Sequence, residues 1–171
     1  MDDLDDMDRR LLTVLHGCGT DPRVAAAARA LSWAGEHGTL WLAAGVVGAA
    51  VDRERRGAWL RGTALTASAH VVSMAVKRLV RRPRPGHVEP LVRTAGRHSF
   101  PSSHATSAAA ATVAFGALGV RVVAPLAAAM CVSRLVVGVH YPSDVAAGAA
   151  LGGLMAGLGT RWMLTGGRDH V

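Results

Sequence analysis

The sequence predicts an all-α fold, a membrane helical bundle of about five transmembrane helices preceded by N-terminal interfacial helices. Half of the 171 residues are apolar, whereas only 4% are aromatic. The apolar residues are mainly Ala, Val, Leu and Gly, whose small side chains allow membrane helices to approach closely. These residues fall into five runs, which are separated by turns that carry Arg. The length corresponds to a single domain.

Residues 1–36 are expected to form an amphipathic region at the membrane interface. The chain opens with the acidic stretch MDDLDDMD, whereas a secretory signal would need a basic start. The amphipathic piece 9–15 and the Ala-rich piece 23–33 are both shorter than the roughly 20 apolar residues that a span requires. We therefore interpret both pieces as interfacial helices.

Residues 37–165 are expected to form the transmembrane domain, and residues 166–171 a C-terminal tail. The five expected spans are 38–51, 58–76, 104–118, 122–137 and 145–163. The turns between them are too short to support a second domain. In the last span, the spacing of Gly148 and Gly152 permits tight helix packing. A soluble Ala- and Gly-rich bundle is the alternative, and the five runs with Arg-bearing turns argue against it.

The distribution of Arg predicts the orientation of a multi-pass protein of a bacterial inner membrane. Alternation of five spans would bring six Arg residues to one side: Arg53, Arg55, Arg56, Arg121, Arg161 and Arg168. By the positive-inside rule this side is cytoplasmic. The opposite side holds the loops 77–104 and 134–144, which are also rich in Arg. Anion binding would explain those cations, so we expect an active site on the extracytoplasmic face.

Three segments on that face combine the residue types that phosphoryl transfer needs. They are residues 77–85, 100–104 and 133–144. Ser102 is a good N-cap for the helix that follows it, and the free N–H groups of a helix N-terminus form a ready anion site. Lys77, Arg84 and Arg134 could neutralise the oxygens of a phosphate held there.

The two histidines of these segments can have separate roles. His140 and Asp144 are four residues apart, so on a helical turn the carboxylate would orient one imidazole nitrogen and leave the other free to attack phosphorus. His104 could protonate the leaving alkoxide as general acid. Cationic side chains would stabilise the transition state, so no metal or other cofactor is expected. Cys18 and Cys131 show no metal-site spacing.

Each motif alone has an ordinary structural explanation. Lys77 and Arg84 could anchor a membrane edge, Ser102 and Ser103 could only cap a helix, and a His–Asp pair is often structural. Their joint occurrence at one membrane face favours a catalytic site.

The pattern Lys77-x6-Arg84-Pro85, Pro101-Ser102-Ser103-His104 and Ser133-Arg134-x5-His140-x3-Asp144 resembles the three-part signature of the type 2 phosphatidic acid phosphatase (PAP2) superfamily. The resemblance covers residues 77–144 and implies a PAP2-like core. Its overall likeness is to small bacterial membrane lipid phosphatases of the polyprenyl-phosphate type.

The resemblance also implies roles for individual residues. Phosphate would be bound by Lys77, Arg84, Ser102, Ser103 and Arg134. His140 would be the nucleophile that forms a phosphohistidine, Asp144 its partner and His104 the acid. Many family members have Gly at position 103, and Ser103 retains the backbone N–H that binds phosphate.

Several alternatives remain open at this stage. The lipid substrate could be a polyprenyl phosphate or diphosphate, a polyprenyl phosphoribose phosphate, phosphatidate or phosphatidylglycerol phosphate. A non-catalytic membrane protein that binds or transports an anionic lipid is a second hypothesis, but it would not need the His and Asp set. A nucleic-acid partner is suggested only by the pI near 11, and the few aromatic residues argue against it. The oligomeric state and the roles of Glu36, His37 and His70 are not predicted.

Overall fold

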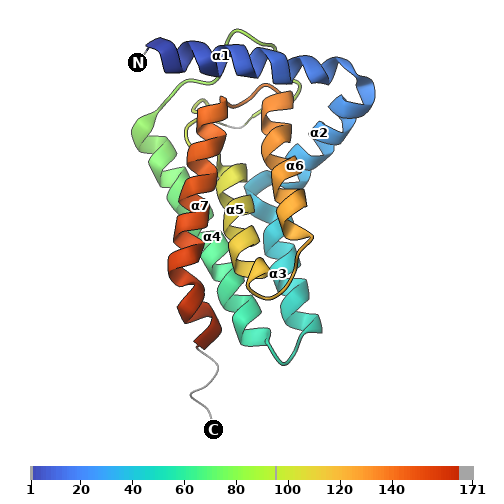
Figure 1. Ribbon diagram of the computed structural model, residues 1–171, viewed down its shortest axis with the longest axis vertical. Helices are drawn as coiled ribbons and strands as arrows, with labels where there is room; N and C mark the ends of the chain where they lie inside the picture. The colour runs from blue at the N-terminus through green and yellow to red at the C-terminus, as the bar shows by residue number, and fades with distance from the viewer. Residues whose placement is uncertain (1, 95, 166–171) are drawn as a thin grey trace.

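The computed structural model describes residues 2–94 and 96–165, and within them the fold is all-helical (Figure 1). The helices are α1 (Asp2–Gly17), α2 (Pro22–Ala34), α3 (Thr39–Val51), α4 (Arg56–Val80), α5 (Ser103–Gly116), α6 (Val123–Val136) and α7 (Pro142–Thr165), with 3-10 turns η1 (Cys18–Thr20) and η2 (Glu36–Gly38). Within these residues the β structure is limited to an isolated bridge between Pro83 and His98. The all-α prediction is confirmed.

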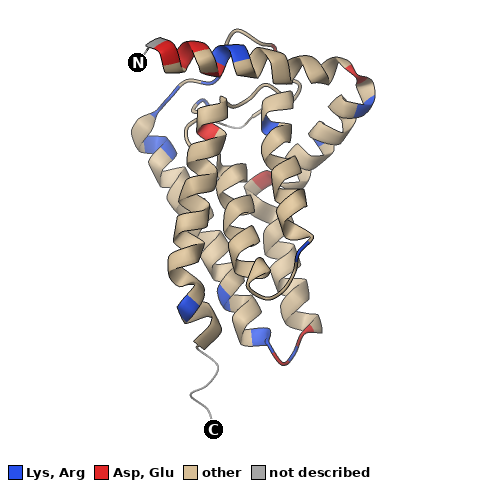
Figure 2. Ribbon diagram, in the orientation of Figure 1, with Lys and Arg blue, Asp and Glu red and all other residues tan. Residues whose placement is uncertain are grey.

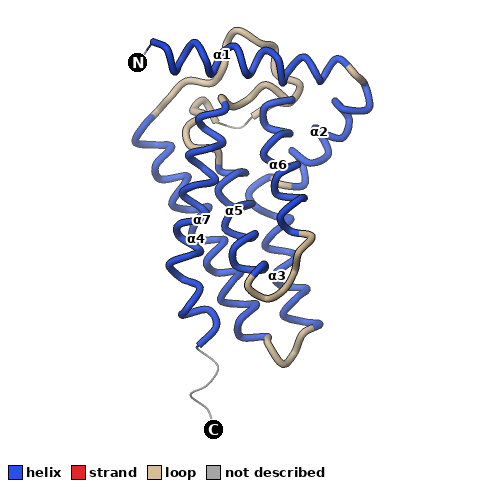
Figure 3. The backbone as a smooth tube through the Cα atoms, in the orientation of Figure 1, coloured by secondary structure: helices blue, strands red, loops and turns tan. Residues whose placement is uncertain are grey.

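The helices α3 to α7 run along the long axis of the molecule, and α1 lies across one end of this bundle (Figure 1). Helix α5 is the central element and contacts α3, α4, α6 and α7. Helix α2 leads obliquely from α1 towards α3. The long connection 81–102 between α4 and α5 lies at the end that α1 covers (Figure 3). The loops that bear the predicted motifs therefore meet at one end.

Helices α5 and α7 pack almost backbone to backbone. A Cβ atom added at Gly148 would lie 2.5 Å from the carbonyl oxygen of Ser102, and one added at Gly152 would lie 2.0 Å from that of Thr106. Side chains cannot occupy such positions, so both glycines are required for this approach. The tight packing that the glycine spacing predicts is confirmed.

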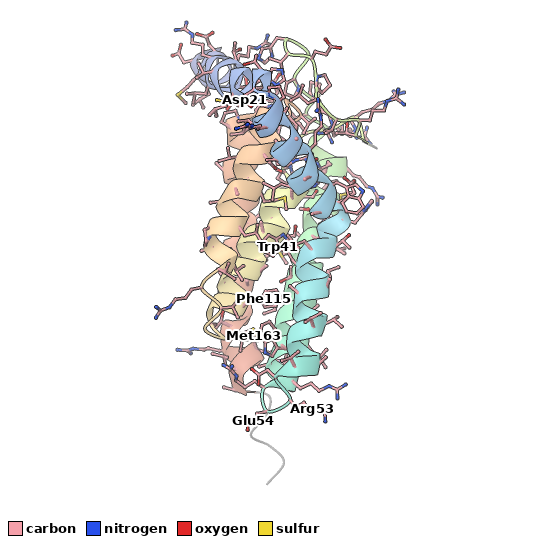
Figure 4. All side chains as sticks on the ribbon, turned by 90° about the vertical axis from the view of Figure 1, so that its right-hand side faces the viewer. Asp21, Trp41, Arg53, Glu54, Phe115 and Met163 are labelled. Atoms are coloured by element: carbon pink, nitrogen blue, oxygen red, sulfur yellow. The ribbon has the colours of Figure 1, made fainter. Side chains whose placement is uncertain are left out.

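Large side chains fill the interior of the bundle. Trp41, Phe115, Met130 and Met163 are almost completely buried in one cluster. Trp59 packs against Phe115 with ring centroids 5.2 Å apart. In Figure 4, Trp41, Phe115 and Met163 follow one another down the length of the bundle. This cluster forms the rigid support below the polar end.

The outer surface of the bundle is rich in branched apolar side chains, whereas small residues occupy its centre. Ala105, Ala108 and Ala111 in α5 have no exposed surface. The exposed apolar residues of α3, α4 and α7 include Val46, Val47, Val51, Val71, Leu154 and Leu158. The middle stretches of α4, α5 and α7 carry no Lys, Arg, Asp or Glu (Figure 2). The sides of the bundle are therefore more apolar than its two ends.

The five predicted spans correspond to α3, α4, α5, α6 and α7, although α4 and α7 extend several residues beyond the predicted limits. No helix within residues 2–94 and 96–165 is both long and apolar enough to be identified as a membrane crossing. The helices are thus confirmed as helices, and their crossing of a membrane stays a prediction. The predicted tail, 166–171, lies outside the described residues.

The N-terminal region contains more helix than predicted, because α1 begins at the acidic stretch and not at residue 9. Carboxylates in the first turns of a helix interact favourably with its dipole. Asp5 and Asp8 also form ion pairs with Arg82 in the connection between α4 and α5. These partners are distant in sequence, so the local pattern did not predict them.

We predict that Gly152→Ala destabilises the protein by about 1–3 kcal/mol, because the added methyl group meets the backbone of α5 and forces the two helices apart. The change would be measured as a lower thermal unfolding temperature of the purified protein. Gly157→Ala is the matched control on the same helix, since nothing lies within 4 Å of its added Cβ. Gly157→Ala should raise the stability slightly, because it replaces an exposed glycine within a helix by a better helix former. Equal effects of both substitutions would contradict the packing argument.

Candidate active site

The three polar segments meet at the end of the bundle that α1 covers. They surround a cavity of about 110 Å³. Six of the eight predicted site residues line it: Lys77, Arg84, Ser103, His104, Arg134 and His140. The other two, Ser102 and Asp144, have no exposed surface. The structure therefore brings together residues that are spread over 68 positions of the sequence, 77–144.

Ser102 caps α5, as predicted, and Ser103 is the serine that reaches the cavity. The Ser102 hydroxyl oxygen accepts a hydrogen bond from the N–H of Ala105 at 3.5 Å, and its own N–H donates to the carbonyl of Asp144 at 3.0 Å. The polar groups of Ser102 are thus engaged inside the protein. The Ser103 hydroxyl donates only to the sulfur of Met74, at 3.4 Å. Since a thioether is a weak acceptor, a phosphate oxygen would readily replace it.

Backbone carbonyl groups direct the two cations of the first motif. Lys77 Nζ donates to the carbonyl of Ser99 at 3.4 Å. Arg84 Nε donates to the carbonyl of Gly96 and Nη1 to that of Val139, both at 2.8 Å. Each head group is therefore fixed at the cavity wall by neutral partners that leave its charge uncompensated.

The charges of Lys77, Arg84 and Arg134 have no carboxylate partner within the described residues. Lys77 is 9% and Arg134 3% exposed. Burial lowers the pKa of Arg84, which nevertheless remains charged at neutral pH. Arg84 is half-buried. Since unpaired charges away from water are costly, these three cations around one cavity favour an anion with more than one negative charge.

His140 and Asp144 form the predicted pair at the start of α7. The Nδ1 atom of His140 lies 3.6 Å from Oδ2 of Asp144, and that oxygen accepts the N–H of Tyr141 at 2.8 Å. A separation of 3.6 Å exceeds a hydrogen bond. Catalytic hydrogen bonds are often long before the substrate binds. Because Nδ1 faces the carboxylate, Nε2 is the nitrogen of His140 that is free for chemistry at the cavity.

The environment of His140 keeps its imidazole neutral. The ring is 2% exposed. Burial lowers the pKa of His140 to about 3; the Asp144 carboxylate opposes this shift, and the nearby charges of Arg134 and Lys77 add to it. At neutral pH the ring therefore carries a free lone pair, which a nucleophile requires.

Ser32 near the end of α2 is a contact residue that the sequence analysis missed. Its carbonyl oxygen is 3.0 Å from Nε2 of His104, and its hydroxyl accepts a short hydrogen bond from Nη1 of Arg134. Since a carbonyl only accepts, Nε2 of His104 carries the proton here. An acid role for His104 through Nε2 therefore requires the leaving oxygen to replace this carbonyl. No local pattern marks Ser32, which lies in an Ala-rich stretch.

Arg82 and Asp8 are also close to the site and were not predicted. Arg82 Nη1 donates to Oδ1 of Asp144 at 3.0 Å, and Nη2 donates to Oδ2 of Asp8 at 2.9 Å. The spacing of Asp5, Asp8 and Leu12 is the available signal, because these residues share one face of α1. That face points towards the bundle, since Leu12 has no exposed surface.

Glu36, His37 and His70 line the same cavity and form its rim, which we define by these three residues. Nδ1 of His70 is buried and has no hydrogen-bond partner among the described residues. His37 lies 3.9 Å from the Glu36 carboxylate. The part of the chain that the structure describes contains no group of three or more His, Cys, Asp and Glu residues able to hold a metal ion. The rim is therefore a set of hydrogen-bonding groups beside the cationic pocket.

The chain is similar to two mycobacterial phosphatases over most of its length and to a third phosphatase over a shorter stretch. It is 46% identical over 134 residues to the decaprenylphosphoryl-5-phosphoribose phosphatase of Mycobacterium tuberculosis, covering 77% of this chain and 76% of that protein. The identity to the corresponding phosphatase of Mycolicibacterium smegmatis is 43%, covering 82% and 80%. The lipid A 1-phosphatase of Rhizobium etli is 42% identical over 89 residues, which are 46% of this chain and 38% of that one.

The fold is also shared with a solved structure. The crystal structure of the transmembrane PAP2 type phosphatidylglycerolphosphate phosphatase from Bacillus subtilis superposes with a TM-score of 0.59 at 21% identity, covering 91% of this chain and 94% of that one. The sequence model of the PAP2 superfamily matches residues 57–168, which include all three motifs. The resemblance that the motifs indicated is thereby confirmed, and the chain belongs to the PAP2 superfamily.

Proposed function

We propose that this phosphatase is embedded in a membrane and hydrolyses a lipid phosphomonoester or diphosphate through a phosphohistidine on His140. The observation that supports the proposal is that two buried cations, Lys77 and Arg134, and the half-buried Arg84 line one cavity together with the neutral His140. None of the three cations has a carboxylate partner among the described residues. The cations match the charge of a phosphate group, and the histidine supplies the nucleophile. The chain needs no metal for this chemistry, because Lys77, Arg84 and Arg134 supply the positive charge.

The reaction runs in two balanced steps. In the first, the Nε2 lone pair of His140 forms a bond to phosphorus while the bond to the lipid oxygen breaks, and His104 transfers a proton to that oxygen. In the second, His104 takes a proton from a water molecule, whose oxygen bonds to phosphorus as the bond from phosphorus to His140 breaks. Inorganic phosphate then leaves. Asp144 stabilises the positive charge that develops on the His140 ring.

A membrane setting would account for the apolar surface of the bundle. Val47, Val71 and Leu158 are at least 60% exposed on three different helices. Hydrocarbon around the bundle would cover this surface, whereas water would leave it as a large apolar patch. Five helices of residues 37–165 would then cross the membrane, with α1 and α2 at its interface. The cavity would open at the level of the lipid head groups.

The Arg distribution supports an extracytoplasmic active site. Arg53 lies at the end of the bundle remote from α1 (Figure 4). The turns at that end are connected, since Arg55 Nη1 donates to the carbonyl of Leu118 at 3.1 Å. The Arg residues at this end lie away from the cavity, so anion binding there does not explain them. The positive-inside rule would then assign this end to the cytoplasm. Arg168, the last member of the predicted set, lies outside the described residues.

The substrate that we favour is a polyprenyl-phosphoryl phosphoribose, the class in the names of the two mycobacterial relatives. The phosphate to be removed is the one on the ribose. The rim of Glu36, His37 and His70 supports it, because such groups can hydrogen-bond the hydroxyls of a sugar. His37 adopts a left-handed backbone conformation, with φ 53°. Non-glycine residues rarely adopt this conformation, and those that do are often found at ligand-binding sites.

The sequence left a non-catalytic protein that binds or transports an anionic lipid as an alternative. It would use the same cations but would not require a neutral, buried histidine next to a carboxylate. The first prediction separates the two functions.

His140→Ala should lower phosphate release by about 1,000-fold or more, because the nucleophile is lost. The assay would use detergent-purified protein with EDTA present and a panel of polyprenyl and glycerolipid phosphates. Brief reaction with a substrate labelled on phosphorus should leave acid-labile label on the wild type and none on the variant. Absence of release from every lipid by the wild type would favour the binding protein, and loss of activity in EDTA would contradict a metal-independent reaction.

Glu36→Gln and His70→Ala should raise KM for the phosphoribose lipid by about 3- to 10-fold, the effect of one lost hydrogen bond. KM for a polyprenyl monophosphate, which lacks the sugar, should stay unchanged. Glu89→Gln is the matched control, because Glu89 is an exposed carboxylate in the loop 81–102. An equal rise of KM for both lipids would exclude a sugar-binding role for the rim.

The low pKa of His140 predicts a pH-dependent stability. Below pH 6.5 the unfolded chain takes up a proton on this ring that the folded protein does not bind, so acidification favours unfolding until the pH reaches about 3. Relative to His140→Asn, the wild type should therefore lose thermal stability steadily between pH 6.5 and pH 4. Parallel unfolding temperatures of the two proteins over this range would show that the folded ring titrates normally.

A further inference from the structure

Helix α1 contacts the catalytic end of the bundle through a buried carboxylate. Asp8 is 5% exposed, although it belongs to a helix whose other charged residues are mostly exposed. Its carboxylate accepts hydrogen bonds from Arg82 Nη2 at 2.9 Å and from the N–H of Ser143 at 2.9 Å. The Ser143 hydroxyl also bonds to it. A buried charge is retained at such a cost only where several partners satisfy it.

Asp8 caps α7 from another part of the chain. Ser143 is in the first turn of α7, where backbone N–H groups have no partner within the helix. The Asp8 carboxylate takes the place of the usual capping side chain, 135 residues away in sequence. Asp144 follows immediately, so the position of α1 fixes the turn from which the catalytic carboxylate extends.

Arg82 connects Asp8 to Asp144. One nitrogen, Nη2, binds the Asp8 carboxylate, while Nη1 donates to Oδ1 of Asp144 at 3.0 Å and to the Ser143 hydroxyl at 2.7 Å. The guanidinium plane lies over the ring of Tyr141, 4.2 Å from its centroid. The planar fork of arginine suits such a two-sided bridge, which the single ammonium of lysine cannot reproduce.

These contacts hold both oxygens of Asp144. Oδ1 accepts from Arg82, and Oδ2 accepts the N–H of Tyr141 while facing Nδ1 of His140. Rotation of the carboxylate would break one of the two hydrogen bonds. Arg82 in turn is shared between Asp144 and Asp8, so it neutralises only part of the charge on Asp144 and leaves the rest for His140.

We propose that Asp8 and Arg82 are positioning residues, which hold Asp144 in the orientation that makes His140 an efficient nucleophile. Helix α1 is thus a part of the active site and not only an interfacial anchor. This inference rests on the proposed phosphohistidine mechanism. It concerns the chemical step, because Asp8 and Arg82 do not line the cavity that would hold the phosphate.

The test measures phosphate release by the full-length wild type and by Asp8→Asn, Arg82→Lys and Asp6→Asn. Asp8→Asn and Arg82→Lys should lower kcat by about 10- to 100-fold, as expected for a misaligned catalytic group, with KM changed less than about 2-fold. Asp6→Asn is the matched control, because Asp6 lies on the exposed face of α1 in an ion pair with Arg10. It removes the same charge from the same helix and should leave kcat unchanged. Thermal unfolding of each variant would verify that it is folded.

A double-mutant cycle separates positioning from simple anchoring of α1. If Asp8 acts through Asp144, Asp8→Asn should cause no further loss of kcat in an Asp144→Asn background. A full additional loss there, or a kcat for Asp8→Asn equal to that for Asp6→Asn, would overturn the positioning role while the phosphatase itself stands. A wild type without phosphate release would overturn the proposed function and this inference together.

Discussion

The close approach of α5 and α7 determines where the predicted catalytic groups lie. Gly148 and Gly152 bring the two backbones together, and the N–H of Ser102 then donates to the carbonyl of Asp144 at 3.0 Å. The N-termini of both helices are thereby fixed side by side. One of them presents Ser103 and His104 to the cavity, and the other carries Asp144 next to His140. Helix packing at the N-terminal end of α5 thus sets the distances between the groups at the cavity.

Under the proposed function, a bound phosphate would supply the negative charge that the cations around the cavity lack. The three cations are held by carbonyl and hydroxyl groups, which orient them without neutralising them. Asp144, by contrast, is held by Arg82 and by a backbone N–H, so it remains directed at His140 and not at the cations. This separation allows a positively charged pocket and a negatively charged orienting group to coexist within one small site.

The sequence predicted most of the residues that meet at the cavity, but few of the contacts that hold them there. The motifs selected Lys77, Arg84 and His140, which do line the cavity, because their residue types and spacing are those that the predicted chemistry requires. The long helices were predicted because their apolar runs are uninterrupted, although their ends were misplaced by a few residues. Ser32 and Asp8 were missed for a different reason. Their partners are 102 and 135 positions away, so only the folded arrangement of α1, α2 and the bundle reveals them.

Helix α1 links the surface of the protein to its chemistry. Its exposed apolar residues, Leu4, Met7, Leu11 and Val14, follow one side of the helix at spacings of three and four, while Asp8 and Leu12 face the bundle. At about 3.6 residues per turn, this apolar side is only about a quarter turn from the side that carries Asp8 and Leu12. Leu4 and Met7 lie with Arg82 and Ser143 around one surface pocket. Since Asp8 caps α7 and shares Arg82 with Asp144, a lipid bound along the apolar side would contact the same helix that orients the predicted catalytic carboxylate.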